Sequence, residues 1–277
     1  MIILDDNILY ETIKVRSAHS YKGDYGHVLL IGGNQQYGGA IIMAAQACLN
    51  SGAGLITVAT QRCNQQALHA RAPEIMAIDY EDTALVSSLL HKADVILIGC
   101  GLGLDEQALS LLKLTLKEIS AAQFLIIDGS ALALCAQYHL PYTEHSKTII
   151  TPHQQEWCRL SQIALTAQNI ETNFAKAKTL NIDAVLKSEQ TQIILHNENE
   201  SFIINNGTPA MATGGTGDTL AGMIAGFTAQ FKNKKALLAA TYLHSKIAHD
   251  LALTNYVVLP TTISANIPRY MKQFEQQ

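Results

Sequence analysis

The chain has few of the features that mark a secreted or metal-binding protein. Its 277 residues contain five cysteines and one tryptophan, and 15% of the residues are charged. The cysteines are odd in number, widely spaced and without a C-x-x-C pair, which argues against a disulfide framework or a cysteine metal site. The histidines lack the H-E-x-x-H spacing of a zinc enzyme, so we predict no metal-ligating residues.

Long apolar runs and basic clusters are also missing. No stretch of about 18 uninterrupted apolar residues is present, so no transmembrane helix is predicted. Asp5 and Asp6 interrupt the first apolar residues, where a signal peptide would continue, and we expect a cytoplasmic protein. The net charge of −4, with scattered lysines and arginines, predicts neither a nucleic-acid nor a membrane partner.

Short apolar runs alternate with helical patterns along most of the chain, as is typical of a buried parallel sheet. The predicted strands are residues 28–31, 55–59, 95–98, 124–127, 148–150, 184–187, 191–196 and 202–204. The predicted helices are residues 39–51, 64–70, 82–91, 106–120, 130–138, 165–180, 219–227 and 236–253, of which the last is the longest.

This order predicts a three-layer α/β/α fold with a mostly parallel central sheet. The last three strands follow one another closely, with a polar turn at residues 197–200, so they are predicted to pair as an antiparallel edge. No linker, repeat or low-complexity tract interrupts the pattern, which predicts one domain over residues 1–277. Ligands of such sheets bind at the carboxyl ends of the strands.

The most informative segment is residues 205–227, NNGTPAMATGGTGDTLAGMIAGF. Gly214, Gly215 and Gly217 can take positive φ and leave room for a ligand, so the backbone amides from Gly214 through Thr216 to Gly217 could converge on a phosphate. The apolar run that follows predicts a buried helix, whose amino-terminal dipole favours an anion. Asp218 would repel that anion unless it has chemical work, such as taking a proton from an attacking hydroxyl.

Asp218 has a simpler explanation, which the sequence leaves open. An acidic residue in the first turn of a helix stabilises it by roughly 0.3–1 kcal/mol through the helix dipole. On this alternative the carboxylate belongs to the start of a helix and to nothing else.

The segment resembles the anion-hole signature of ribokinase-like small-molecule kinases, and its pattern N-x-G-x-x-x-M-A-T-G-G-T-G-D-x-L-A-G resembles the ADP- or ATP-dependent NAD(P)H-hydrate dehydratases of their carbohydrate-kinase-like branch. Further blocks match in the same order along the chain. They are residues 21–34 with 37–40, 71–76, 99–103, 126–132 and 151–153. Ser130, Gln155 and Ser188 depart from the family pattern, which usually has aspartate, glycine and glycine there.

The resemblance implies a cofactor-repair reaction that returns the S-epimer of hydrated NADH or NADPH to NADH or NADPH. Asp218 would be the catalytic base, and a hydroxyl on the nicotinamide ring would be phosphorylated by ADP or ATP and then leave as phosphate. Mg²⁺ would bridge the phosphates of the nucleotide. The implied partners are these small molecules, further copies of the chain in a homo-oligomer such as a tetramer, and a separate NAD(P)H-hydrate epimerase, since no fused epimerase domain is expected.

The resemblance also assigns binding residues. Ala40, Gly103 and His153, with Asp218, would bind the hydrated cofactor. The residues implied for the nucleotide are Lys187, Ser188, Glu189, Gln190, Thr191 and Gly217. From the residues alone, Gly103 could belong to an ordinary strand-to-helix turn, His153 could be a helix cap, and Lys187 could be a solvated lysine on an edge strand.

Two other functions remain open. The anion-binding glycines and Asp218 would equally suit a kinase of this architecture that phosphorylates a thiazole or pyrimidine alcohol and stops there. A non-catalytic adenine-nucleotide sensor would keep the cradle but would not need Asp218.

Overall fold

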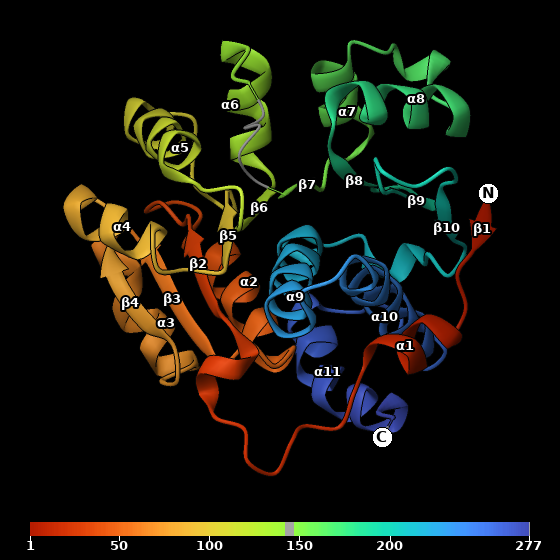
Figure 1. The fold of residues 1–277 in the computed structure, drawn as a ribbon, viewed down its shortest axis with the longest axis horizontal. Coiled ribbons are helices and arrows are strands. Elements are labelled where there is room, and N and C mark those ends of the chain that lie inside the picture. The colour runs from red at the N-terminus through yellow and green to blue at the C-terminus, as the bar shows by residue number, and fades with distance from the viewer. Residues whose placement is uncertain (142–146, 277) are drawn as a thin grey trace.

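The computed structural model describes residues 1–141 and 147–276, and its strands form one sheet (Figure 1). In chain order the strands are β1 (Ile2–Ile3), β2 (His27–Ile31), β3 (Leu55–Thr60), β4 (Met76–Asp79), β5 (Val95–Ile98), β6 (Phe124–Ile127), β7 (Lys147–Ile150), β8 (Asp183–Leu186), β9 (Thr191–Ile194) and β10 (Phe202–Ile204). Across the sheet their order is β1-β10-β9-β8-β7-β6-β5-β2-β3-β4.

The sheet is parallel from β4 to β8, and β9 runs antiparallel to both of its neighbours. The predicted parallel sheet with an antiparallel edge is therefore confirmed. Two strands were not predicted. β1 is a pair of residues that adds to β10 in parallel, too short to carry a sequence pattern, and β4 is a half-exposed edge strand without a continuous apolar run.

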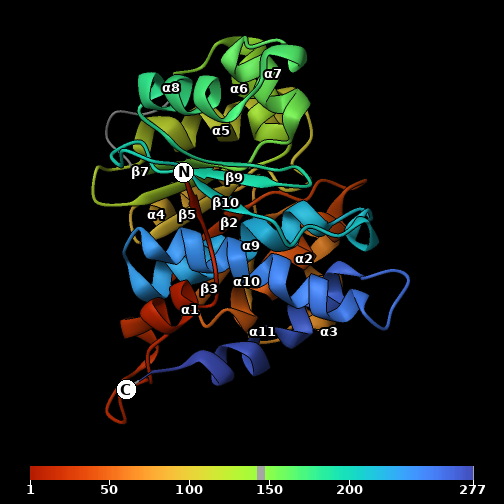
Figure 2. The ribbon, with the colours of Figure 1, turned by 90° about the vertical axis from the view of Figure 1, so that its right-hand side faces the viewer.

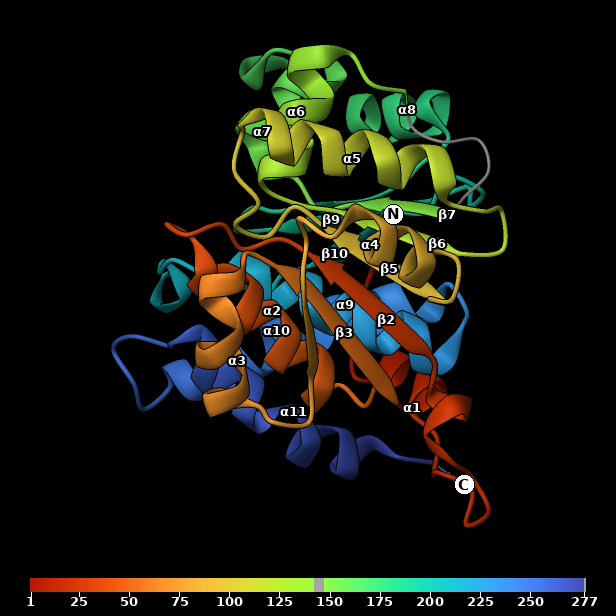
Figure 3. The same cartoon turned by 90° about the vertical axis from the view of Figure 1, so that its left-hand side faces the viewer.

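Helices cover both faces of the sheet (Figures 1, 2 and 3). One face carries α4 (Thr83–Leu90), α5 (Glu106–Glu118), α6 (Ser130–Tyr138), α7 (Gln154–Ser161) and α8 (Ile170–Leu180). The other carries α1 (Asn7–Thr12), α2 (Gly38–Asn50), α3 (Gln65–Arg71), α9 (Thr216–Phe231), α10 (Lys235–Ala252) and α11 (Pro260–Phe274). Four short 3₁₀ segments connect them: η1 (Lys22–Tyr25), η2 (Arg62–Asn64), η3 (Leu165–Ala167) and η4 (Pro209–Met211).

Successive residues of a strand belong to two separate hydrophobic cores, one on each face of the sheet. In β2, Val28 and Leu30 belong to the core beneath α2 and α9, whereas Leu29 and Ile31 belong to the core beneath α5 and α6. Because side chains alternate along a strand, a strand that is apolar at every position can serve both faces at once. The predicted three-layer α/β/α fold is confirmed.

Helix α9 is the best-buried helix next to the sheet, with eleven consecutive buried residues. A Cβ on Gly222 would collide with the carbonyl oxygen of Ala44, and a Cβ on Gly226 would lie 2.7 Å from the carbonyl oxygen of Cys48. Both glycines therefore let α9 approach α2 at backbone distance. This packing holds the first turn of α9 in one place at the carboxyl edge of the sheet.

Within residues 1–141 and 147–276, every helix is too short or too polar to span a lipid bilayer. The single sheet favours the prediction of one domain over residues 1–277, of which residues 142–146 and 277 lie outside the described part of the chain. That prediction stays a proposal.

Candidate active site

The residues that come directly after five adjacent strands lie at one edge of the sheet. Gly32 follows β2, Gly99 follows β5, Asp128 follows β6, Thr151 follows β7 and Lys187 follows β8. These strands are parallel neighbours, so their carboxyl ends lie side by side. The motif blocks that the sequence places after separate strands are therefore brought together.

The loops after β5 and β6 touch each other and the start of α2. Gly99 has φ of +125°, and a Cβ there would collide with the carbonyl oxygen of Asp128. Gly101 has φ of +62° and packs in the same way against Tyr37 and Ala40. Glycine is required at both positions, because they combine a left-handed backbone with close approach of another chain segment.

The first turn of α9 completes the site. Gly215 is its N-cap, with φ of +96°, and Thr216, Gly217 and Asp218 form its first turn. Helix α9 thus begins three residues before the predicted start at residue 219. The prediction was late because the glycine and threonine of the first turn do not continue the apolar pattern of the helix. Among the described residues, no acceptor is found for the backbone amides from Gly214 to Gly217. These amides are free to bind an anion.

Only one of the three predicted hinge glycines uses positive φ. Gly214 and Gly217 have ordinary negative φ, in contrast to Gly215. A Cβ on Gly214 would meet nothing within 4 Å, whereas a Cβ on Gly217 would lie 3.2 Å from Lys187 Nζ. The value of glycine at 217 is therefore the space it leaves beside the lysine, and not a bend of the backbone.

Asp218 lies in a polar cluster at the centre of this edge. Ligand atoms of Cys100, Asp128 and Asp218 all lie within 4.8 Å of one another. Asp128 Oδ1 already accepts hydrogen bonds from Thr151 Oγ1 at 2.6 Å and from Lys187 Nζ at 3.0 Å. Such a paired carboxylate has little capacity left for a cation.

The surroundings weaken Asp218 as an acid. Burial first, and the negative charge of Asp128 second, raise the pKa of Asp218 to about 6, while Cys100 and Lys187 act in the opposite direction. Burial, together with both carboxylates, raises the pKa of Cys100 well above its usual range, so its thiol stays protonated. A carboxylate with a pKa near neutrality is suited to general-base catalysis.

Nearby carboxylates keep the Lys187 ammonium protonated although the side chain is largely buried. Burial alone would lower its pKa, but Asp128 and then Glu156 outweigh that effect, and the pKa of Lys187 is raised. Its side chain is 23% exposed and that of Asp128 is 4% exposed. Lys187 is therefore not the solvated edge lysine of the alternative interpretation.

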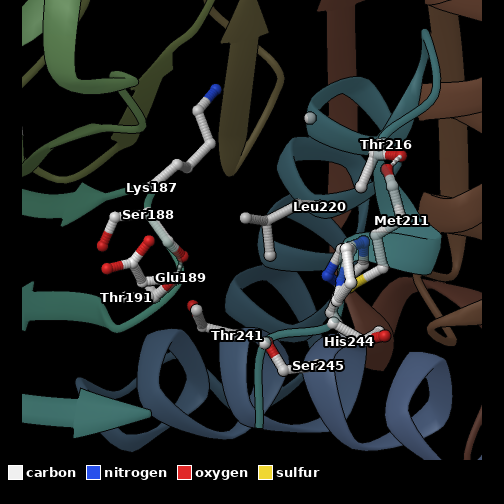
Figure 4. Close-up of a pocket in the computed structure, with 15 residues that line it drawn as sticks. Lys187, Ser188, Glu189, Thr191, Met211, Thr216, Leu220, Thr241, His244 and Ser245 are labelled. Carbon is white, nitrogen blue, oxygen red and sulfur yellow. Dashed lines mark hydrogen bonds between the residues drawn. The ribbon is translucent and has the colours of Figure 1, made fainter. Parts of the chain in front are cut away.

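A cavity of about 510 Å³ opens beside this cluster, between the loop after β8 and the helices α9 and α10 (Figure 4). Of the residues expected to bind the nucleotide, Lys187, Ser188, Glu189, Thr191 and Gly217 line it, and Thr216 lines it too. In Figure 4 the side chain of Lys187 extends away from Ser188 and Glu189. The volume is typical of a small-molecule site.

Gln190 does not line this cavity, but lines a neighbouring hollow of about 170 Å³ together with Lys187, Ser188 and Glu189. Ser188, which departs from the family pattern of glycine, has no positive φ, and its hydroxyl donates to the carbonyl oxygen of Gln190 at 2.7 Å. The loop therefore accommodates a serine without backbone strain.

Two of the residues expected to bind the hydrated cofactor lie at the loop after β5 and the start of α2. Ala40 packs against the Gly101 turn. Gly103 is at φ of +93°, and its amide donates to Ser130 Oγ at 3.1 Å, so Ser130 supplies an acceptor where the family usually has aspartate. Their contacts with the loops after β5 and β6 connect them to the segment that carries Asp128.

His153 is a helix cap. Its Nδ1 accepts hydrogen bonds from the backbone amides of Gln155 and Glu156, at 3.1 and 3.3 Å. An accepting Nδ1 places the proton of the neutral ring on Nε2, which lies 3.5 Å from Glu156 Oε1, and the His153 side chain is 52% exposed. The capping role that the sequence left open is confirmed.

Helix α10 supplies cavity residues that sequence reasoning missed, namely Thr241, His244 and Ser245. His244 is buried, and its Nε2 has no hydrogen-bond partner among the described residues. Burial lowers the pKa of His244 to about 4, with the nearby Thr216 carbonyl opposing it. Its position on an apolar helical pattern gave no signal of a ligand-facing role.

Asp128 was also missed, although its block was noticed. The available signal was an acidic residue placed directly after a continuous apolar strand, Phe124–Ile127. Such a residue must lie at the carboxyl edge of a parallel sheet.

The comparisons with known proteins agree over the whole chain. The family model for NAD(P)H-hydrate dehydratase matches residues 28–269. The chain is 50% identical, over 100% of its own length and 94% of the relative's, to the ADP-dependent (S)-NAD(P)H-hydrate dehydratase of Enterococcus faecalis.

Solved structures show the same fold. A crystal structure of a ribokinase-like superfamily protein from Enterococcus faecalis has a TM-score of 0.97 and 49% identity, covering 100% of this chain and 97% of that one. The ADP/ATP-dependent NAD(P)H-hydrate dehydratase of Bacillus subtilis, co-crystallised with ATP and Mg²⁺, has a TM-score of 0.87 and 27% identity, with 99% of both chains covered. These findings confirm the resemblance carried by the sequence motifs, and the chain belongs to the NAD(P)H-hydrate dehydratase family.

Proposed function

We propose that this protein uses ADP to dehydrate the S-epimer of hydrated NADH or NADPH, which returns the damaged cofactor to its active form. The full-length relative of Enterococcus faecalis carries this activity in its name. The observation that carries the proposal is the position of Asp218. Its carboxylate stands in the first turn of α9, next to open backbone amides, between the nucleotide-sized cavity and the loops after β5 and β6.

The chemistry runs in two steps. Asp218 accepts the proton of the ring hydroxyl as that oxygen attacks the terminal phosphoryl group of ADP, which releases AMP. The ring then loses a proton and expels the new phosphate ester as inorganic phosphate, so a poor leaving group has become a good one. The balance is hydrated cofactor plus ADP giving NAD(P)H, AMP, phosphate and one proton.

Each group of the site has a role in this scheme. The open amides of Gly214, Gly215, Thr216 and Gly217 stabilise the charge on the transferring oxygens, and Lys187 neutralises phosphate beside them. The rest of the nucleotide occupies the cavity lined by Ser188, Glu189 and Thr191, with Gln190 at its margin. Ala40, Gly103 and His153 line the pocket for the hydrated cofactor.

Magnesium fits this site as an ion that would bind together with the nucleotide, and not as an ion held by protein side chains alone. The one group of three metal-ligand side chains in the described residues includes Asp128, which is already paired with Lys187. Phosphate oxygens and water would hold Mg²⁺, whose contribution is to neutralise the phosphates of the nucleotide.

An assay of hydrated NADH with ADP, with ATP or with no nucleotide tests the proposal. We expect phosphate release together with a rise in absorbance at the NADH band, with ADP giving the greater rate. Asp218→Asn should keep the fold and lose most of the turnover. Absence of NADH formation with either nucleotide would refute the proposed function.

The same assay separates the rival functions. An alcohol kinase of this fold would release an intact phosphorylated alcohol and no inorganic phosphate. A nucleotide sensor would bind ADP without turnover of any substrate. Asp218 favours catalysis over both sensing and simple helix capping, because its carboxylate lies within 4.8 Å of ligand atoms of Cys100 and Asp128 at the strand ends.

The surroundings of the reaction are also proposals. We expect it to take place in the cytoplasm, with a separate epimerase chain supplying the S-epimer. We expect a homo-oligomer such as a tetramer, and light scattering on the purified protein would measure its mass.

A further inference from the structure

Asp128 is a buried carboxylate that joins three other strand ends. Its Oδ1 accepts from Thr151 Oγ1, after β7, and from Lys187 Nζ, after β8, at 2.6 and 3.0 Å. Its Oδ2 accepts from the thiol of Cys100, after β5, at 3.8 Å. A carboxylate this deep is retained only when each oxygen has such partners.

Lys187 connects Asp128 to the first turn of α9. The ammonium lies 3.2 Å from the place where a Cβ on Gly217 would stand, so it is next to the first turn of α9 and its open amides. A lysine side chain has four rotatable bonds and reaches one such point only if something holds its end. Asp128 is the group that holds it.

We propose that Asp128 is a positioning residue of the phosphoryl-transfer site: it holds the Lys187 ammonium beside the first turn of α9 and places a negative charge next to Asp218. The effect of Asp128 on phosphoryl transfer rests on the proposed function. Its effect on the pKa of Asp218 does not depend on what the enzyme catalyses. The charge of Asp128 makes Asp218 a stronger base, and the charge of Lys187 limits that effect.

The charged and titratable groups around Asp218 come from every element packed against it. Asp128 follows β6, Lys187 follows β8 and Cys100 follows β5, and all three act on Asp218. Glu156 of α7 and His244 of α10 act on this set through their interaction with Lys187. A purely structural Asp128 would tie the strands together and leave the proton affinity of Asp218 untouched.

The test is a carboxyl-carbon NMR titration of protein labelled at its aspartates, in which the Asp218 signal is the one missing from Asp218→Asn. In Asp128→Asn we expect the titration midpoint of Asp218 to move to lower pH. Thr151→Val is the matched control, because it removes a hydrogen bond to Asp128 and leaves every charge in place. Its midpoint should stay close to that of the unaltered protein.

Lys187→Met removes the positive charge of the cluster instead of the negative one. It provides the same titration test if Asp128→Asn does not fold. Loss of the ammonium should move the midpoint of Asp218 to higher pH. A midpoint of Asp218 that stays in place in the folded variants, or that moves equally in Thr151→Val, would overturn the proposal whatever the enzyme catalyses.

The kinetic arm tests positioning. With Asp128→Asn the lysine still meets phosphate as a mobile cation, so calorimetry should show ADP affinity equal to or tighter than that of the unaltered protein. The kcat should fall about a hundredfold, because the ammonium is no longer in place for the transition state. Loss of ADP affinity in proportion to kcat would mean that the pocket itself had collapsed, and would overturn the positioning role. If the unaltered protein shows no dehydration, the proposed function fails and the titration still decides about Asp128.

Discussion

Asp218→Asn should stabilise the protein at neutral pH while it abolishes turnover. The pKa of Asp218 rises from the ordinary value of 3.8 to about 6, chiefly through burial and secondly through Asp128. A tenfold change in a protonation equilibrium is worth about 1.4 kcal/mol, so keeping this carboxylate ionised in the folded protein costs about 3 kcal/mol of unfolding free energy. Asparagine has nearly the same shape and carries no charge.

The pH dependence of this gain has a definite sign. A carboxyl group whose pKa is raised on folding favours the folded state while it is protonated, and this contribution is lost as the pH rises through about 6. The stability difference between Asp218→Asn and the unaltered protein should therefore be largest above pH 7. It should shrink between pH 6 and pH 4 and vanish below the unfolded-state pKa.

Denaturant unfolding at a series of pH values measures this difference, and thermal unfolding should show a rise in Tm on the order of 6 °C at neutral pH. Glu106→Gln is the matched control, since Glu106 is an exposed acid in the first turn of α5. There the helix dipole predicts a loss of roughly 0.3–1 kcal/mol. A similar loss in Asp218→Asn would refute our reasoning and would assign Asp218 to helix capping alone.

Three further results are expected. Gly217→Val should weaken ADP binding at least tenfold in calorimetry, because its branched side chain would crowd Lys187 Nζ. Gly39→Ala is the control, since a Cβ there meets no other residue within 4 Å and Gly39 does not line the nucleotide cavity. His244, with its pKa lowered to about 4, should take up no proton above pH 5 in an NMR titration, and uptake near pH 6.5 would mean that it is solvated. Gly222→Val should destabilise the fold by about 3 kcal/mol or more in urea unfolding, since its side chain would strike the backbone of α2, and a smaller loss would mean that α9 can shift.

Much of the fold could be predicted because the central strands are apolar at every position. A strand such as β5, Val95–Ile98, has no polar residue that could interrupt the pattern. The elements that were missed obtain their structure from tertiary contacts. β1 has two residues and exists only because β10 offers it hydrogen-bonding partners, and the start of α9 is determined by packing around Gly215 and Met43.

The site was predictable at its glycines and much less so at its charges. The Gly214–Asp218 segment carries its own local signal, because so many glycines near one acid are unusual in a helix. The partners of Asp218 come from separate strands, and only the strand order β5-β6-β7-β8 brings Asp128 and Lys187 together. Whether Lys187 was a solvated lysine or one paired with a carboxylate could not be decided without the position of β6.

The two carboxylates explain how a site that binds anions can contain an acid. Asp128 and Lys187 form a pair whose net charge is close to zero, so Asp128 does not by itself oppose a phosphate at the first turn of α9. Among the described residues, Asp218 forms no ion pair, so its ionisation in the folded protein remains energetically costly. Its repulsion toward an incoming phosphate is relieved once it takes up the proton of the attacking hydroxyl, which is the moment at which the phosphoryl oxygens gather charge on the amides of α9. The electrostatic cost of Asp218 is therefore high in the folded resting protein and falls as the reaction proceeds, which is the direction that favours catalysis.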